Sequence, residues 1–340
     1  MEVAEADPRA DAGDNIQSLT VLRIHMKHII PGWTSNARLA QSFILALVAA
    51  LQVNAAESGK RFATPEDAVA ALARAVMTTN RAELHAIFGP ALEKIVNPDA
   101  VQAANELAAF AAAFGATNSL VRESETRRVL ELGTEHWPFP VPILKKDAQW
   151  FFDTAAGVDE LVNRRIGRNE LETLQAVRAY VDAQREYASR DRDGDEVLEY
   201  AQKIISTPGA KDGLFWSPDI DGEISPLGPF AAAAAAEGYG KGRKNTDAGP
   251  QPFHGYFFKL LTRQGNHAPG GKYDYVINGN MIGGFALVAW PAEYGGSGVM
   301  TFVVNQQGRV YQKNLGQDTA KIAEAMTAYD PDTTWSVSRD

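Results

Sequence analysis

Short strand-like segments fill most of the last third of the sequence, and their spacing restricts the folds that it can adopt. Each is rich in aromatic or β-branched residues, and glycine, asparagine or proline separates it from the next. Consecutive strands with short connections pair with one another, so the pattern predicts an antiparallel meander. Its expected strands are residues 253–262, 273–278, 283–291, 299–305 and 309–314.

A long amphipathic helix is expected before this meander. Asn169 with Glu172 three residues later resembles a capping box, so the helix should begin at Asn169 and run to about Tyr187. Its apolar face should pack on the sheet. The residues that form this face are Leu171, Leu174, Val177 and Val181.

The preceding part of the chain changes from a helical to a strand-like period. Helices are expected at residues 62–76, 81–88 and 99–114, because Thr64 can cap the first and glycines end the other two. Strands are expected at residues 127–133, 137–146 and 148–155. Three prolines confine the middle strand to an edge or a bulge. Two further helices are predicted, at residues 231–236 and 319–329.

The expected fold class is therefore α+β, in two parts. Residues 56–163 should form N-terminal helices with a small antiparallel sheet, similar to the nuclear-transport-factor-like cone at the level of fold alone. Residues 164–340 should form a helix packed on the meander, which resembles the head of bacterial pilins and pseudopilins. The long apolar helix with which pilins polymerise is missing. The boundary is expected near residues 163–169.

An apolar run near the N-terminus predicts export. It extends from Phe43 to Leu51, and Val53 and Ala55 follow at the positions that a signal peptidase reads. Residues 26–55 are thus interpreted as a signal peptide that is cleaved near Ala55–Ala56. A helix belonging to the fold is the alternative, but the run lacks a polar face. It is also too short to span a bilayer, so no membrane span is expected in the mature chain.

The charges around this run support the same interpretation. No acidic residue lies between Met26 and Ala56, whereas Lys27 and Arg38 are basic. Upstream of Met26 the chain is acidic. Translation is therefore predicted to start at Met26, with residues 1–25 as a non-translated or non-native lead-in. The mature protein should be periplasmic or secreted.

Composition excludes several kinds of function. The formal net charge is -9 and no Lys/Arg-rich run offsets it, so no nucleic-acid partner is expected. The chain has no cysteine, which excludes disulfides, thiolate nucleophiles and thiolate-bound zinc.

The segment "DRDGDEVLEY" (191–200) is a candidate calcium site, because alternating carboxylates on a turn can point several oxygens at one ion. The EF-hand pattern is incomplete: Glu196 stands where the loop needs glycine, and the twelfth position is Gln202. A shorter loop closed by Glu199 and a solvated polar turn are both open interpretations. The candidate calcium ligands are Asp191, Asp193, Asp195 and Glu199.

The motifs of common enzymes are missing. No G-x-S-x-G occurs, and the four histidines after residue 55 form no H-x-x-x-H pair, which disfavours serine hydrolases and zinc sites. Paired carboxylates for sugar hydrolysis would not be visible in a sequence. His254, Tyr256 and Tyr273 could line a groove or pack in the core. The basic residues Arg164, Arg165 and Arg168 could bind an anion or pair with nearby glutamates.

Several longer stretches resemble one family. They include "FATPEDAVAAL", "WPFPVPILKKDAQWFFDTAAG", "PFHGYFFKLLTRQG" and "YDYVINGNMIGGFALVAWPAEYGGSGVMTFVVNQQGRVYQKNLG". They are similar to the bacterial domain-of-unknown-function family 2950, and the likeness covers nearly all of the mature chain. It implies an exported bacterial protein and no particular activity.

The favoured interpretation of function is a non-enzymatic structural or interaction protein of the cell envelope. Its partner would be an envelope protein or a polysaccharide, and calcium is its candidate cofactor. The alternative is a periplasmic hydrolase that acts on cell-wall glycan or polysaccharide. A deep cleft with two facing carboxylates would favour the hydrolase, whereas a shallow sheet face that bears aromatic side chains would favour the interaction protein.

Overall fold

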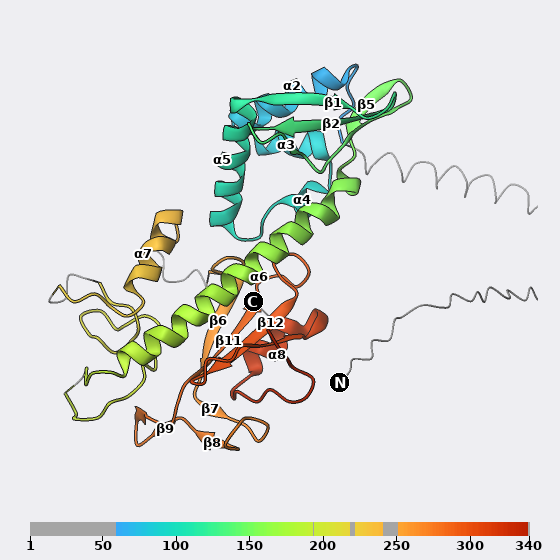
Figure 1. Cartoon of the computed structure of the whole chain (residues 1–340). Helices are drawn as coiled ribbons and strands as arrows, with labels where there is room; N and C mark the ends of the chain where they lie inside the picture. Colours follow the sequence, from blue (N-terminus) through green and yellow to red (C-terminus); the bar gives the residue numbers. More distant parts are fainter. Residues whose placement is uncertain (1–58, 193, 218–221, 241–250, 339–340) are drawn as a thin grey trace, which may run out of the picture. The chain divides into compact units, whose positions relative to one another are not determined.

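The structure is a computed structural model that describes residues 59–192, 194–217, 222–240 and 251–338 (Figure 1). The predicted lead-in (1–25) and signal peptide (26–55) lie outside these residues, and so does Asp193. No helix in the described part of the chain is long and apolar enough to cross a membrane.

Capping residues set the beginnings of the first helices. Thr64 forms a capping box with Asp67, Asn80 accepts from the backbone N–H of Glu83, and Asp99 accepts from two N–H groups of the last helix. The three predicted helices are confirmed, and a short one between them was not predicted. The helices are α2 (Pro65–Met77), α3 (Arg81–Phe88), α4 (Leu92–Ile95) and α5 (Ala100–Ala116).

An antiparallel sheet follows these helices, with strand order β1-β2-β4-β5 and β3 paired to β2. The expected strand at residues 137–146 is split by its prolines into β3 and β4, because proline cannot donate to a ladder. β1 was not predicted. The strands are β1 (Asn118–Arg122), β2 (Arg127–Leu132), β3 (Trp137–Pro138), β4 (Ile143–Lys146) and β5 (Gln149–Phe152).

The helices and this sheet enclose a core of their own. Phe88 contacts Phe139 and Phe152, with ring centroids 6.1 and 5.2 Å apart. Leu72, Ile87, Leu130 and other apolar side chains fill the space around these rings. Burial of this apolar surface is the main force that holds the N-terminal part together.

α6 (Thr154–Tyr187) is one continuous helix of 34 residues, capped by Asp153 (Figure 1). The predicted start at Asn169 is therefore wrong. Asn169 is fully buried, and its side-chain amide donates to the carbonyl of Ser297 at 2.9 Å instead of capping a helix. Leu171 is exposed, whereas Leu174, Val177 and Val181 are buried as expected.

The C-terminal sheet is antiparallel, in the order β14-β13-β12-β11-β6. Four of the five expected strands enter it as neighbours, which confirms the meander for those segments. The strands are β6 (Tyr256–Leu261), β11 (Ala286–Pro291), β12 (Met300–Asn305), β13 (Tyr311–Asn314) and β14 (Ser336–Val337).

The expected strand at residues 273–278 does not join this sheet, which corrects the prediction. Asn278 and Gly279 have positive φ and close a tight hairpin directly after the strand. The segment therefore forms two small ladders instead. β7 (Arg263–Gln264) pairs with β8 (Tyr273–Asp274), and β9 (Val276–Ile277) pairs with β10 (Asn280–Met281).

The remaining helices agree with the sequence patterns, with one difference. α7 (Gly228–Glu237) contains the alanine run. A 3-10 turn, η1 (Gly316–Asp318), leads into α8 (Thr319–Ala325), which ends before the predicted residue 329. The chain turns there because the backbone N–H of Tyr329 donates to the carbonyl of Arg263.

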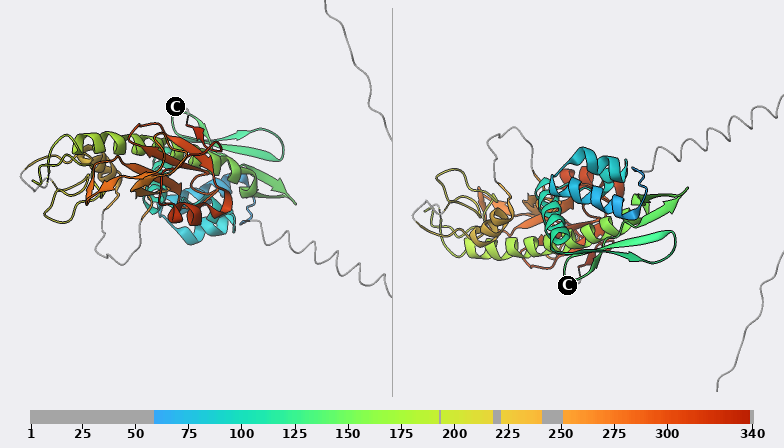
Figure 2. Two further views of the ribbon diagram at one scale, coloured as in Figure 1. Left: turned by 90° about the horizontal axis from the view of Figure 1, so that it is seen from below. Right: turned by 90° about the horizontal axis from the view of Figure 1, so that it is seen from above.

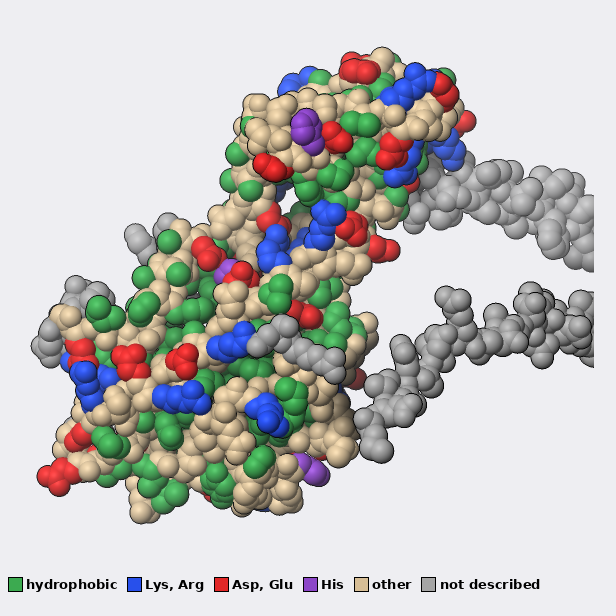
Figure 3. Space-filling view, viewed as in Figure 1, with side chains coloured by type: hydrophobic (Ala, Val, Ile, Leu, Met, Phe, Trp, Pro, Cys, Tyr) green, Lys and Arg blue, Asp and Glu red, His purple; other side chains and the backbone are tan. Residues whose placement is uncertain are grey.

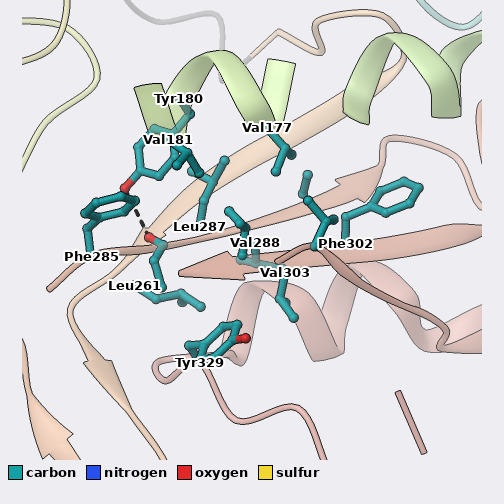
Figure 4. Packing of buried hydrophobic residues seen from close by; sticks show 14 of the residues in the cluster. Val177, Tyr180, Val181, Leu261, Phe285, Leu287, Val288, Phe302, Val303 and Tyr329 are labelled. Atoms are coloured by element: carbon teal, nitrogen blue, oxygen red, sulfur yellow. Dashed lines mark hydrogen bonds between the residues drawn. The ribbon is translucent and has the colours of Figure 1, made fainter. Parts of the chain in front are cut away.

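α6 covers one face of the C-terminal sheet, and α8 with Tyr329 covers the other (Figures 2 and 4). Tyr180 of α6 contacts Phe285 edge to face at 5.6 Å, and its hydroxyl donates to the carbonyl of Ala286. Leu287 and Phe302 are buried in the same cluster. The prediction of a long helix packed on an antiparallel sheet is confirmed, and so is the α+β class.

Two clusters of buried side chains thus form among the described residues, one in each predicted part. α6 runs unbroken through the predicted boundary at residues 163–169. Separate folding of residues 56–163 and 164–340 stays a prediction.

Candidate functional site

A partly buried polar cluster, with Asp99, Gln102 and His254 buried, joins α5 to the segments around α7 and β6. Asp99 is 1% exposed, and its Oδ1 accepts from the N–H groups of Val101 and Gln102. Its Oδ2 accepts from the hydroxyl of Tyr239 at 2.7 Å and from the N–H of Gly255 at 3.2 Å. One carboxylate thus satisfies four donors from three segments. We call Asp99, Gln102, Glu237, Tyr239 and His254 the Asp99 junction.

His254 has hydrogen-bond partners on both ring nitrogens. The amide nitrogen of Gln102 lies 2.6 Å from Nδ1, and because an amide nitrogen only donates, Nδ1 is the acceptor. Nε2 then carries the proton and faces Glu237 Oε2 at 3.2 Å. A general base needs a free nitrogen next to its substrate. His254 is therefore arranged to hold segments together.

Tyr239 completes the junction as a donor. Burial raises the pKa of its hydroxyl, and the hydrogen bond to Asp99 raises it further. The hydroxyl stays protonated, so it can donate to Asp99 while it accepts from the backbone N–H of His254 at 3.1 Å. Phe253 packs against this tyrosine with ring centroids 4.7 Å apart.

The other two residues of the predicted aromatic groove do not join His254 at a surface. Tyr256 is fully buried, and its hydroxyl donates to the carbonyl of Met300 at 3.0 Å. Tyr273 lies on β8 and is partly exposed. The core-packing interpretation is correct for Tyr256.

The acidic segment forms a turn whose carboxylates accept backbone hydrogen bonds. Asp191 accepts from the N–H groups of Gly194 and Glu196, at 2.7 and 2.9 Å. Asp195 accepts from the N–H of Val197 and from the side chain of Asn280, at 2.8 and 2.7 Å. Glu199 accepts from the N–H of Met281 at 2.9 Å. The turn is therefore attached to the β9–β10 hairpin.

No group of three acidic or histidine side chains positioned to hold a metal ion occurs among the described residues. Because Asp193 is not among them, the calcium site stays a prediction. Through the bonds to Asn280 and Met281, Asp195 and Glu199 dock the turn on β10.

The irregular segment after this turn is fixed by a partly buried ion pair. The Arg192 guanidinium lies between the rings of Tyr187 and Trp216, at 5.2 and 5.1 Å, and bonds to Glu223 at 2.7 Å. Lys211 contacts the other oxygen of Glu223 at 2.7 Å. The hydrogen bonds from Lys211 and Arg192 lower the pKa of Glu223. The backbone here is thus held by contacts despite having little regular structure.

Exposed aliphatic side chains occur on this same segment and on the neighbouring hairpin. Figure 3 shows hydrophobic side chains at several places on one face of the molecule, interspersed with charged ones. Leu198 and Ile282 flank the bond between Glu199 and Met281. The backbones of Ile205 and Phe215 form an isolated β-bridge, and both residues line a hollow of about 240 Å³ together with Trp216. We call these residues the aliphatic surface: Leu198 (59% exposed), Ile205 (69%), Ile224 (68%), Ile277 (45%) and Ile282 (44%).

The basic cluster serves structural contacts. Arg164 pairs with the nearby Glu160, as the ion-pairing interpretation expects, whereas Arg168 pairs with Glu106 of α5 and not with a neighbouring glutamate. Arg165 differs, because it is buried and donates to the carbonyls of Lys94 and Ile95 at the end of α4. It thereby satisfies carbonyls that a helix end leaves without partners.

The two best-formed hollows in the described residues do not contain facing carboxylates. The larger, about 410 Å³, lies between α2, α5 and β1 and includes one carboxylate, that of Glu66. The smaller is the one beside Ile205, and none of its lining residues is acidic. Neither has the paired acids that glycoside hydrolysis requires.

One family model, described as "Protein of unknown function (DUF2950)", matches residues 59–337, which include the Asp99 junction, the acidic turn and both clusters. The chain belongs to the DUF2950 family. The resemblance noted in the sequence is thereby confirmed. No curated protein and no solved structure matches this DUF2950 chain, so the likenesses to nuclear transport factor and pilin heads stay predictions.

Sequence reasoning missed most of the Asp99 junction. It identified Asp99 only as the beginning of a helix and His254 only as a groove residue. Gln102, Glu237 and Tyr239 gave no signal, because none of them lies close in sequence to its partner in the junction. An asparagine or aspartate cap is ordinary on a surface, and only its burial shows that this one has further partners.

Proposed function

We propose that this DUF2950 protein is exported and acts in the bacterial cell envelope as a non-enzymatic interaction protein. Its binding face would be the aliphatic surface. Exposure of Ile205 and Ile224 to more than two thirds of their area is the observation that carries this proposal. Clustered aliphatic side chains on a monomer are characteristic of protein-binding sites.

The way these side chains are held supports a binding role. The Arg192–Glu223 pair and the Glu199–Met281 bond fix the backbone beneath them. A partner that docks there meets a preformed surface, which reduces the entropy lost on binding. A partner that matches an aliphatic surface is an envelope protein with an apolar face, whereas a polysaccharide would bind better to aromatic rings with polar neighbours.

Export is tested at the N-terminus of the mature protein. Protein recovered from the periplasm of a producing bacterium should begin at or near Ala56, because Val53 and Ala55 occupy the cleavage positions. N-terminal sequencing measures this directly. A first residue of Met1 or Met26 would refute cleavage.

The partner is tested with a photo-crosslinking amino acid at Ile205 in living cells. A discrete crosslinked protein is expected, and it should disappear when Ile224→Ser removes a neighbouring aliphatic group. Ile322 of α8, which is 40% exposed, is the matched control position outside the aliphatic surface. Equal crosslinking from Ile205 and Ile322, or none from either, would contradict the proposed face.

We further propose that calcium stabilises the acidic turn through Asp191, Asp193, Asp195 and Glu199. An ion that binds only the folded state adds RT ln(1 + [L]/Kd), about 2.7 kcal/mol at a hundredfold excess over Kd. Chelation should then lower the melting temperature, and Asp193→Asn should remove this sensitivity. Asp182→Asn, on the exposed face of α6, is the control and should leave the effect of chelation on the melting temperature unchanged. Identical melting in calcium and in EDTA would rule the site out.

A further inference from the structure

The backbone of β1 leaves its outer hydrogen-bonding groups without a partner. The carbonyl of Thr117 accepts from the N–H of Gly133, and the N–H of Glu123 donates to the carbonyl of Arg127. Hydrogen-bonded and non-bonded pairs alternate along an antiparallel ladder, so the backbone groups of Ser119 and Val121 point toward β2. The carbonyl of Leu130 accepts from Phe139, which shows that the Leu120–Leu130 pair is a non-bonded one. The N–H and C=O groups of Asn118, Leu120 and Arg122 therefore point away from the sheet.

Nothing in the described residues pairs with that side of β1. The opposite edge differs, because Phe62 pairs with Trp150 of β5. Natural edge strands are commonly protected by charged side chains, above all lysine, by proline or by a bulge. β1 reads Asn-Ser-Leu-Val-Arg, has no lysine, proline or bulge, and carries one charge, that of Arg122 at its end. An edge with so little protection is suited to pairing with another strand.

An apolar hollow runs beside the open edge. Its volume is about 410 Å³, and its walls come from α2, from Phe114 of α5 and from β1. Leu120 and Asn118 line it, so alternate residues of β1 face the hollow, and Arg122 faces the same way. Glu66 is its one charged residue. The α2 residues that give it apolar character are Val69, Ala70 and Ala73.

We propose that a second copy of the chain occupies this edge, with the two β1 strands antiparallel about a two-fold axis at Leu120. The unpaired groups of Leu120 then bond to those of the other Leu120, and Asn118 lies opposite the other Arg122. The two N-terminal sheets become one continuous sheet, and the two hollows meet across the axis. This inference concerns a surface other than the aliphatic one, so each can fail without the other.

Charge complementarity argues for a second copy over an unrelated strand. In this register Arg122 of one copy lies about 5.5 Å, Cα to Cα, from Asn118 of the other. Asn118 and Glu66 line the same hollow, so the guanidinium arrives beside the Glu66 carboxylate. Arg122 is 59% exposed and pairs with the still more exposed Glu125, a contact of little energetic weight. Two-fold symmetry forms the Glu66–Arg122 pair twice.

Sedimentation of the full chain over a wide concentration range tests the proposal. A monomer–dimer equilibrium is expected. Glu66→Arg and Arg122→Glu should each weaken it at least about tenfold, because each places two like-charge contacts in the interface. The double variant restores opposite charges and should recover dimerisation. Lys146→Glu, on the exposed end of β4, is the control for a reversed charge in the same sheet and should leave the dimer unchanged.

Each other outcome overturns the proposal. A monomer at every concentration would leave the edge open or assign it to a different protein. A dimer that resists both single reversals would use another surface. A double variant no better than the single ones would refute the register through Leu120, even if β1 lies in the interface. Circular dichroism of each variant shows that the fold persists.

Discussion

Asp99→Ala is expected to lower the free energy of unfolding by about 3 kcal/mol or more. The substitution leaves four donors without an acceptor: the N–H groups of Val101, Gln102 and Gly255, and the hydroxyl of Tyr239. Gln102 and Gly255 are buried, so their N–H groups lose a partner that water does not readily replace, whereas Val101 and Tyr239 are only partly buried. Urea unfolding followed by tryptophan fluorescence measures the change.

Asp153→Ala is the matched control for this prediction. Asp153 also caps a helix, but it accepts only one bond, from the N–H of Ala156 at 3.4 Å. Loss of an ordinary N-cap costs about 1 kcal/mol. If both variants lose the same stability, Asp99 is merely a cap and the junction adds nothing. Asp99→Asn should fall between them, because one amide oxygen keeps the two bonds within α5.

The contrast between these aspartates shows what a sequence can and cannot predict. Local rules correctly placed the start of α2, because Thr64 needs only neighbouring N–H groups to act as a cap. The same rules gave the wrong start for α6. Asn169 has the residue type of a cap, yet its partner is Ser297, in a distant turn of the C-terminal part.

Strand prediction failed for a related reason. The segment at residues 273–278 has the composition of a strand, and its residues do form ladders. The segment does not join the larger sheet, because the turn at Asn278–Gly279 pairs its residues 276–277 with β10. β1 was missed because residues 118–122 carry few aromatic or β-branched side chains. Its pairing with β2 outweighs that weak propensity.

The candidate site was the least predictable part. The acidic turn is visible because its residues are adjacent, but its attachment to Asn280 and Met281 is not. The aliphatic surface collects residues from three separate segments, and each alone is an ordinary exposed apolar residue. Which exposed side chains share a surface, and which strand lies at the edge of a sheet, depend on the tertiary fold and cannot be read from local sequence.

Two glycines of α6 provide the other large prediction, because the same substitution should have opposite effects in one helix. At Gly157 a β-carbon would lie 2.6 Å from Val141 Cγ2 and 2.8 Å from both Pro140 O and Val141 Cα. Two of these atoms belong to the backbone of the loop between β3 and β4. That loop is anchored, since Val141 is fully buried and the carbonyl of Pro142 accepts from Asp153.

Gly157→Ala should therefore lower the free energy of unfolding by about 2 kcal/mol or more, because overpacking outweighs the gain in helix propensity. At Gly167 no atom lies within 4 Å of the added carbon and the residue is exposed. Gly167→Ala should raise the stability by about 0.5–1 kcal/mol, because alanine loses less backbone entropy on entering a helix. Urea unfolding of both variants measures the difference. Equal effects of one sign would show that the first turns of α6 do not pack closely on the loop before β4.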